Sequence, residues 1–286
     1  MGERKLREAF APQSASQFGE AKLCKNYAKR LLRDMYVFRQ SRLAKPIIAK
    51  QTLRVSFLQL NMITTQKMLE ARVHFGHKVQ NWNPKMAPYI FGERNGVHVI
   101  DLIQTKIYLD YVCKFLAKKK HKNARILFVC TKEHMSTTIA DVARQCSSNY
   151  VNNRWLGGLL TNWNTMEKSM RKLRQLEYRE KKHLLDKLPK KEIALLRKRK
   201  EKLEKYFGGM KNMYQLPHLV ILIGQQRETS AVLECQKLNI PIITILDTNC
   251  DPSLTNLFIP ANDDSIKSIS LILNELGRAI NCARLS

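Results

Sequence analysis

The 286-residue sequence lacks several features on which common protein functions depend. It has no run of about 18 apolar residues, so we expect no membrane-spanning helix and no membrane partner. Its seven cysteines are scattered singly, without a C-x-x-C pair, which favours reduced and mostly buried thiols over disulfides. No internal repeat is present. These absences leave a globular chain, in which 44% hydrophobic residues are available for a core.

The glycine motifs that bind nucleotide phosphates are also missing. RILFVC, residues 125–130, is a continuous apolar run typical of a strand buried on both faces, but the turn after it, TKEHMSTT, contains no glycine. Neither G-x-G-x-x-G nor G-x-x-x-x-G-K-[ST] occurs anywhere in the chain. Although Thr131 and Lys132 could touch a phosphate there, the sequence predicts no nucleotide cofactor.

Acidic residues are scarce relative to basic ones. The chain has 50 Lys and Arg against 24 Asp and Glu, a formal net charge of +26. The excess lies in residues 1–60 (+9), 61–164 (+9) and 165–216 (+10), whereas residues 217–286 carry −2. A charge of this size implies an anionic polymer as partner, and we expect no small-molecule substrate.

Apolar patterns divide the sequence into four segments. After residue 125, buried strands alternate with helices, which indicates a mainly parallel, doubly wound α/β sheet. Two apolar stripes separated by Leu188-Pro189 predict an antiparallel helical hairpin inserted into this sheet, with Lys200 interrupting the second stripe. The predicted segments are a basic N-terminal helical extension (1–61), a first part of the α/β domain (62–164), the hairpin (165–216) and a second part (217–286).

Two shorter elements are expected between residues 89 and 120. The β-rich runs YIFG and VHVID surround Asn95-Gly96, which predicts a β-hairpin. A helix from residue 103 to about 120 should follow, with Ile107, Tyr111 and Phe115 on one apolar face, which Ile103 could extend.

Four carboxylates follow the later strands and raise an alternative function. Asp247, Asp251, Asp263 and Asp264 could hold a divalent metal at the edge of the sheet, as in a metal- or nucleotide-dependent enzyme. The pattern favours another interpretation, in which Asp251 initiates a turn before Pro252 and the two later aspartates cap the last helix.

Other candidates for chemistry have weaker support. His74 and His77 form a close pair, but no third ligand lies in range, so we expect structural or RNA-facing histidines rather than a zinc site. Ser136, Cys130 and Cys250 lie in no recognisable nucleophile motif. The sequence therefore predicts no catalytic residue, metal ligand or cofactor site.

Two stretches combine the residue types that bind RNA. They are KVQNWNPKMAPYIFGERNG, residues 78–96, and VNNRWLGGLLTNWNT, residues 151–165. Arginine offers a planar fork to phosphate, tryptophan a stacking face, and asparagine a paired donor and acceptor. In the second stretch we expect Trp155 and Trp163 to be mostly structural. The predicted RNA-binding residues are Lys78, Trp82, Asn83, Lys85, Arg94, Arg154 and Asn162.

Several motifs resemble one known family. VHFGHKVQNWNPKMAPYIFGERNGVHVIDL, LFVCTK, YVNNRWLGGLLTNW, LPKKE, GGMKNM-x-x-LP, LDTNCDP and IPANDDSI occur in the order found in the S-two (S2) family of small-subunit ribosomal proteins. The likeness covers residues 62–284 and is greatest to the plastid and cyanobacterial branch. It departs at Gly224, where similar sequences commonly carry Asp, and residues 1–60 match no family pattern.

The resemblance implies a flavodoxin-like domain with a coiled-coil hairpin and no enzymatic activity. It further implies binding to small-subunit (16S-type) rRNA between head and body, beside neighbouring ribosomal proteins. We therefore expect a structural constituent of the small ribosomal subunit of the chloroplast, with the bacterial cytoplasm or the mitochondrion as alternative locations. The functional alternatives left open are the enzyme described above and a free regulatory RNA-binding protein.

Overall fold

A computed structural model describes residues 63–121, 124–184 and 189–285. The predicted N-terminal extension, with its basic helix, lies outside these residues. The chain divides into two units, Met1–Phe57 and Leu58–Ser286, and all that follows concerns the second unit.

The centre of this unit is a parallel five-stranded sheet. Its strands are β4 (Ile126–Val129), β5 (Asn149–Val151), β6 (Leu219–Ile223), β7 (Ile242–Leu246) and β8 (Leu257–Pro260). The spatial order is β5-β4-β6-β7-β8, so that the first strand of the sheet lies between the second and the third. This is the strand order of flavodoxin-like folds, and the predicted fold class is confirmed.

Three helices cover one face of the sheet. α3 (Leu102–His121), α4 (Ser136–Gln145) and α8 (Ile266–Leu285) share a buried core with alternate strand residues, among them Ile126 and Phe128. Because successive side chains of a strand point to opposite faces, this alternation assigns each strand residue to one of the two layers.

The opposite face is covered by α7 (Thr229–Lys237) and by the base of a helical hairpin. Leu127 and Val129, the residues that alternate with those of the first core, pack here. Trp155 lies in the same core and is only 7% exposed, which confirms its structural role. The central strands are buried at every position, as a strand enclosed by two layers requires.

The orientation predicted for α3 is wrong. Tyr111 is 41% exposed, and Ile107 and Phe115 are only half-buried. This helix carries two apolar stripes, both with spacings that suit one face of a helix, so periodicity alone could not decide which of them faces the sheet. The stripe that is buried consists of Leu109, Val112, Cys113 and Leu116.

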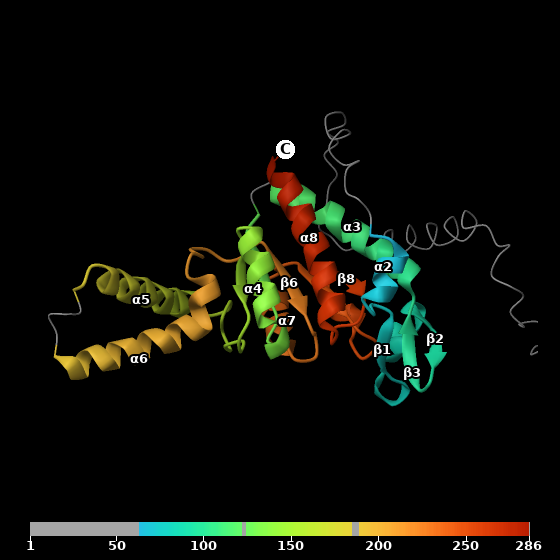
Figure 1. Cartoon of the computed structure of the whole chain (residues 1–286), viewed down its shortest axis with the longest axis horizontal. Coiled ribbons are helices and arrows are strands. Elements are labelled where there is room, and N and C mark those ends of the chain that lie inside the picture. Colours follow the sequence, from blue (N-terminus) through green and yellow to red (C-terminus); the bar gives the residue numbers. More distant parts are fainter. Residues whose placement is uncertain (1–62, 122–123, 185–188, 286) are drawn as a thin grey trace, which may run out of the picture. The chain divides into compact units, whose positions relative to one another are not determined.

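The hairpin consists of α5 (Trp163–Lys181) and α6 (Lys190–Phe207), which lie side by side (Figure 1). Its seam contains the charged residue that interrupts the second apolar stripe. Lys200 Nζ lies 2.5 Å from Glu180 Oε2 on the facing helix, so this ammonium has a partner. Of the predicted break at Leu188-Pro189, the leucine lies outside the described residues, and Pro189 directly precedes α6 as its N-cap residue.

A smaller antiparallel sheet precedes α3. Its strands β1 (Phe75–Lys78), β2 (Ile90–Arg94) and β3 (Val97–Ile100) have the order β1-β3-β2. Asn95 and Gly96 have φ angles of 52° and 73°, the left-handed conformation of a tight hairpin turn, so the predicted β-hairpin is confirmed. β1 was not predicted from the sequence.

Candidate nucleic-acid interface

A buried ammonium occupies the carboxyl edge of the five-stranded sheet, where open α/β folds bind ligands. Lys132, in the turn after β4, is 5% exposed. Its Nζ lies 3.0 Å from Asp263 Oδ1 and 2.8 Å from Asp264 Oδ1. Burial alone would lower the pKa of Lys132, but the two carboxylates outweigh burial and raise it. The residue that could have contacted a phosphate is therefore held inside the protein as a cation.

The expectation that Asp263 and Asp264 cap the last helix is wrong. Their side chains contact Lys132 instead, and the turn before α8 is closed by Asn262, whose Oδ1 accepts hydrogen bonds from the backbone N–H groups of Asp264 and Ser265 at 2.9 and 3.1 Å. Both carboxylates are thereby left to neutralise Lys132. The sequence pattern located the turn correctly but assigned the wrong role to the two aspartates.

His77 connects the small sheet to the same cluster. Its ring nitrogens lie 3.2 Å from Asp247 Oδ2 and 3.4 Å from Asp264 Oδ2. The bond to Asp247 raises the pKa of His77, and this outweighs the opposite effect of burial. His77 is therefore a structural histidine, one of the two roles expected from the sequence.

This cluster also contains the atoms that a metal site would need. Ligand atoms of His77, Asp263 and Asp264 lie within 4.8 Å of one another. The Lys132 ammonium, however, already lies within hydrogen-bonding distance of both carboxylates. Positive charge inside the cluster opposes a divalent cation, so the geometry does not favour the metal-enzyme alternative.

The loop after β7, LDTNCDP (residues 246–252), holds the first predicted RNA-binding stretch against the sheet. The backbone N–H of His77 donates to Thr248 Oγ1 and that of Asn83 to the Thr248 carbonyl, each at 2.9 Å. Lys85 Nζ lies 2.6 Å from Asp251 Oδ2. Asp251 also accepts from Ser253 N at 2.9 Å, which confirms that it initiates a turn.

Two of the predicted RNA-binding residues therefore have internal partners. Lys85 is engaged by Asp251, and Asn83 caps the 3-10 helix η4 (Pro84–Tyr89) by accepting from the Lys85 N–H at 3.0 Å. The sequence identified an irregular basic loop correctly, but much of its polar chemistry holds the loop in place.

Lys78 and Arg94 lie on one face of the small sheet. Both residues pair with Val97, Lys78 from β1 and Arg94 from β2, so their side chains leave the same face on either side of it. Both are exposed, and neither side chain forms a hydrogen bond or ion pair within the described residues. Trp82 is 37% exposed and packs on the His98 ring, 5.1 Å away, which places it on the other face of β3.

One carboxylate organises the second predicted stretch. Glu234 of α7 accepts hydrogen bonds from Trp155 Nε1 at 3.0 Å and from the backbone N–H groups of Gly158, Leu160 and Thr161 at 2.8, 2.9 and 3.1 Å. Burial alone would raise the pKa of Glu234, but these donors lower it. The loop is therefore wrapped around a carboxylate of its own chain.

Arg154 and Asn162 lie on the outside of this loop. Both are exposed: Arg154 follows β5, and Asn162 directly precedes α5. The β1-β3-β2 sheet is instead bonded to the loop after β7, where the His77 N–H donates to Thr248. The structure thus places the seven predicted residues in two separate groups.

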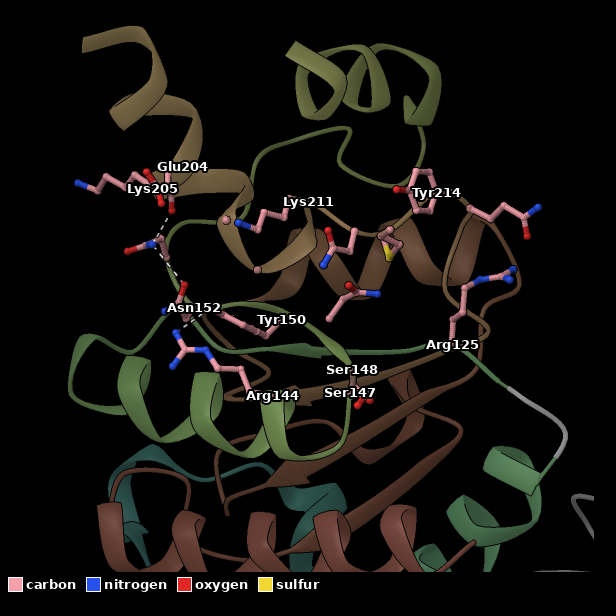
Figure 2. A pocket seen from close by; sticks show the side chains of 17 residues that line it. Arg125, Arg144, Ser147, Ser148, Tyr150, Asn152, Glu204, Lys205, Lys211 and Tyr214 are labelled. Carbon is pink, nitrogen blue, oxygen red and sulfur yellow. Dashed lines mark hydrogen bonds between the residues drawn. The ribbon is translucent and has the colours of Figure 1, made fainter. Parts of the chain in front are cut away.

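A polar groove beside β5 was not predicted. It has a volume of about 840 Å³ and lies between β5, the end of α4 and the chain that leaves the hairpin through η6 (Gly208–Met210). Figure 2 shows Arg144 and Tyr150 lining one side and Lys211 and Tyr214 the other. We name it the β5 groove, and its main polar lining is Arg144, Tyr150, Asn152, Lys205, Lys211 and Tyr214.

Close contact between η6 and β5 forms the floor of this groove. A Cβ atom on Gly209 would lie only 2.2 Å from the Tyr150 carbonyl oxygen, so only glycine fits there. The GGMKNM motif was recognised in the sequence, within the segment assigned to the hairpin. Its position against the edge strand depends on contacts between segments more than 50 residues apart, which sequence patterns do not reveal.

The cysteines carry no sign of reactivity. Five of the six described cysteines are buried, and Cys282 is exposed. Burial raises the pKa of Cys113, Cys235 and Cys250 to about 12 and that of Cys130 to about 11. These thiols are neutral at physiological pH and unsuited to nucleophilic catalysis.

The fold and its surfaces define a class of protein. The carboxyl edge of the sheet is closed by internal ion pairs, while cations lie on outer surfaces, and this combination suits a binding protein for a polyanion rather than an enzyme. Residues 68–283 match the family model described as Ribosomal protein S2. The chain belongs to the ribosomal protein S2 family, and it is a structural protein rather than an enzyme.

Individual relatives agree with this family. The chain is 52% identical over 221 residues to the small ribosomal subunit protein uS2 of Synechococcus sp. (strain JA-2-3B'a(2-13)), covering 77% of this chain and 84% of that protein. It is 53% identical over 218 residues to uS2c of Oltmannsiellopsis viridis, covering 76% and 92%. The match to uS2c of Emiliania huxleyi is 50% over 221 residues, covering 77% and 96%.

The resemblance inferred from the motifs is thereby confirmed. In the described part of the chain, no helix has the length and apolar character needed to cross a membrane.

Proposed function

We propose that the chain is a structural constituent of the small subunit of a plastid ribosome and binds small-subunit rRNA directly. The observation that carries the proposal is membership of the S2 family together with a net charge of +26. Relatives named uS2c in Oltmannsiellopsis viridis and Emiliania huxleyi, beside the cyanobacterial protein, support the plastid assignment.

Three exposed cations are proposed to bind rRNA phosphates. Lys78 and Arg94 extend from one face of the small sheet, and Arg154 lies beside β5. None of the three has a carboxylate partner within the described residues, so RNA would not have to displace an internal ion pair. Trp82 and Asn162 are exposed enough to add stacking or hydrogen bonds, whereas Asn83 and Lys85 are proposed to position the loop.

Neighbouring ribosomal proteins are proposed as further partners. The hairpin supports this, because Tyr178 and Leu195 are 58% and 68% exposed on its two helices. Exposed apolar side chains of this kind suit contacts with another protein.

The salt dependence of rRNA affinity tests the proposal. The full-length chain and a Lys78→Ala/Arg94→Ala/Arg154→Ala variant would be titrated against transcribed plastid 16S-type rRNA at several salt concentrations. Loss of three phosphate contacts should lower the slope of log affinity against log salt by about 2 to 3. A matched variant should replace three exposed cations on other surfaces, Lys237, Lys267 and Lys118, by alanine.

Equal slopes for the two triple variants would contradict the assignment of these three residues. If the wild-type chain bound rRNA no better than an unrelated RNA and did not sediment with small subunits, the proposed function itself would be wrong. Sedimentation also separates it from the alternative of a free regulatory protein, which would remain at the top of a gradient.

A further inference from the structure

The β5 groove combines positive charge with open polar groups. Arg125, Arg144, Lys205 and Lys211 line it, against the single carboxylate of Glu204. Its volume of about 840 Å³ lies within the range of sites that hold organic ligands, about 300 to 1,000 Å³. A ligand that fills it should carry negative charge.

Some of this charge is available to a ligand. Lys205 is exposed, and its side chain has no hydrogen-bond or ion-pair partner within the described residues. Arg144 pairs with Asp141 at 3.1 Å, but both side chains are more than 60% exposed. A surface pair of this kind contributes little stability, so a phosphate can compete for the guanidinium at small cost.

An aromatic ring is also open to the groove. Tyr214 is 63% exposed, and the Arg174 guanidinium lies 4.6 Å from its ring centroid. Figure 2 places this ring across the groove from Tyr150. Asn212 and Gln215, on either side of Tyr214 in the chain, are exposed and have no hydrogen bond within the described residues. Amides of this kind can pair with base edges.

We infer that the β5 groove binds a single-stranded segment of RNA several nucleotides long, with a base stacked on Tyr214 at one end of the groove and a phosphate further along the strand held by Lys205 and Arg144 at the other end. This inference rests on the proposed rRNA-binding function and assigns a site to one part of it. An acidic peptide would match the cations but would make no use of the ring and the free amides. A duplex keeps its bases stacked inside and could not place one on the tyrosine.

Binding of short RNA by the full-length chain tests the inference. Fluorescence anisotropy would be measured with a labelled oligouridylate, a duplex RNA and an oligoglutamate as probes. Tyr214→Ala should weaken oligouridylate binding by about 5- to 150-fold, the usual effect of losing one stacked base, and Tyr214→Phe should retain binding. Lys205→Ala should lower the salt slope by about 0.7.

The hairpin offers a matched control. Tyr178 is 58% exposed, has the Lys182 ammonium 5.9 Å from its ring centroid and lies outside the groove. Tyr178→Ala should leave oligouridylate affinity unchanged. In addition, a 4-thiouridine oligonucleotide should crosslink to the peptide that contains Tyr214. Because both tyrosines are exposed, the Tyr214→Ala and Tyr178→Ala variants should unfold at the same temperature as the wild-type chain.

Several results would overturn the inference. Equal affinities of the Tyr214→Ala and Tyr178→Ala variants, a preference for duplex RNA, or tighter binding of oligoglutamate than of oligouridylate would each do so. These results would leave the proposed function intact as long as the chain still bound small-subunit rRNA. Failure of the wild-type chain to bind that rRNA would instead refute the proposed function.

Discussion

Replacing Glu234 by glutamine should destabilise the fold far more than a surface substitution does. One carboxylate oxygen accepts from Trp155 and Gly158, and the other from Leu160 and Thr161. In glutamine one of these oxygens becomes an NH₂ group, which faces donors and cannot accept from them. Whichever way the amide turns, at least two N–H groups lose their acceptor.

The magnitude follows from these lost bonds. Hydrogen bonds to a charged group contribute about 1.5 to 3 kcal/mol each, and the carboxylate is half-buried, so a discount for solvent applies. We expect the free energy of unfolding to fall by about 2 to 4 kcal/mol at pH 7. Glu201→Gln, at an exposed position of α6 with no partner within the described residues, should change it by less than about 0.5 kcal/mol.

Urea unfolding monitored by tryptophan fluorescence measures this difference. The three tryptophans all lie between residues 82 and 163, so the signal reports on the unit described here. Because the pKa of Glu234 is lowered in the folded state, its contribution is complete above the unfolded value of 4.5 and is lost as pH falls through the folded value. The gap between wild type and Glu234→Gln should therefore narrow on acidification.

Two results would refute this reasoning. One is a difference below about 0.5 kcal/mol at pH 7, which would place Glu234 among ordinary surface residues. The other is a difference that stays the same at about pH 3, which would mean that the charge of the carboxylate is irrelevant to the loop.

Three further predictions concern the contacts that close the fold. Lys132→Met leaves the buried carboxylate of Asp263 without its cation, so the free energy of unfolding measured in urea should fall by about 3 to 5 kcal/mol. An unchanged unfolding midpoint would contradict the buried ion pair. Because the pKa of His77 is raised in the folded state, the stability that protonated His77 contributes is complete below pH 6.5 and is lost as pH rises through the folded pKa. The difference in melting temperature between the wild type and His77→Gln should therefore be larger at pH 6 than at pH 9. A difference that does not change with pH would contradict this. Gly209→Ala should cost about 1 to 3 kcal/mol or more by thermal unfolding, whereas Gly157→Ala, whose Cβ would meet no atom within 4 Å, should not; equal effects would contradict the close approach.

Local sequence patterns predicted the central strands because each of these is enclosed by two layers. β4, β6 and β7 are buried at every position, and an unbroken apolar run indicates this without knowledge of the neighbours. β1 was missed because FGHK has neither such a run nor an alternation. It becomes a strand only by pairing with β3, about 20 residues away.

The interface was harder to predict for the same reason. The exposed positions of Lys78 and Arg94 agree with the expectation from their basic, irregular stretch. The sequence could not tell that Lys85 is paired, because its partner Asp251 lies 166 residues away. Charges can be counted along a chain, but whether each one is free or neutralised is decided by the tertiary fold.

The pairing of Lys200 with Glu180 affects how the two helices of the hairpin are aligned along their length. If α6 slid by one helical turn along α5, about 5.4 Å, the ammonium would leave its carboxylate and both charges would lose their partner in the seam. A seam made only of apolar side chains would tolerate such a shift, since each side chain would meet another apolar side chain in its new position. Together with the Lys211–Glu177 pair, which holds α5 to the chain after α6, this contact favours one alignment of the two helices, so that the cations along their outer surfaces keep a constant spacing.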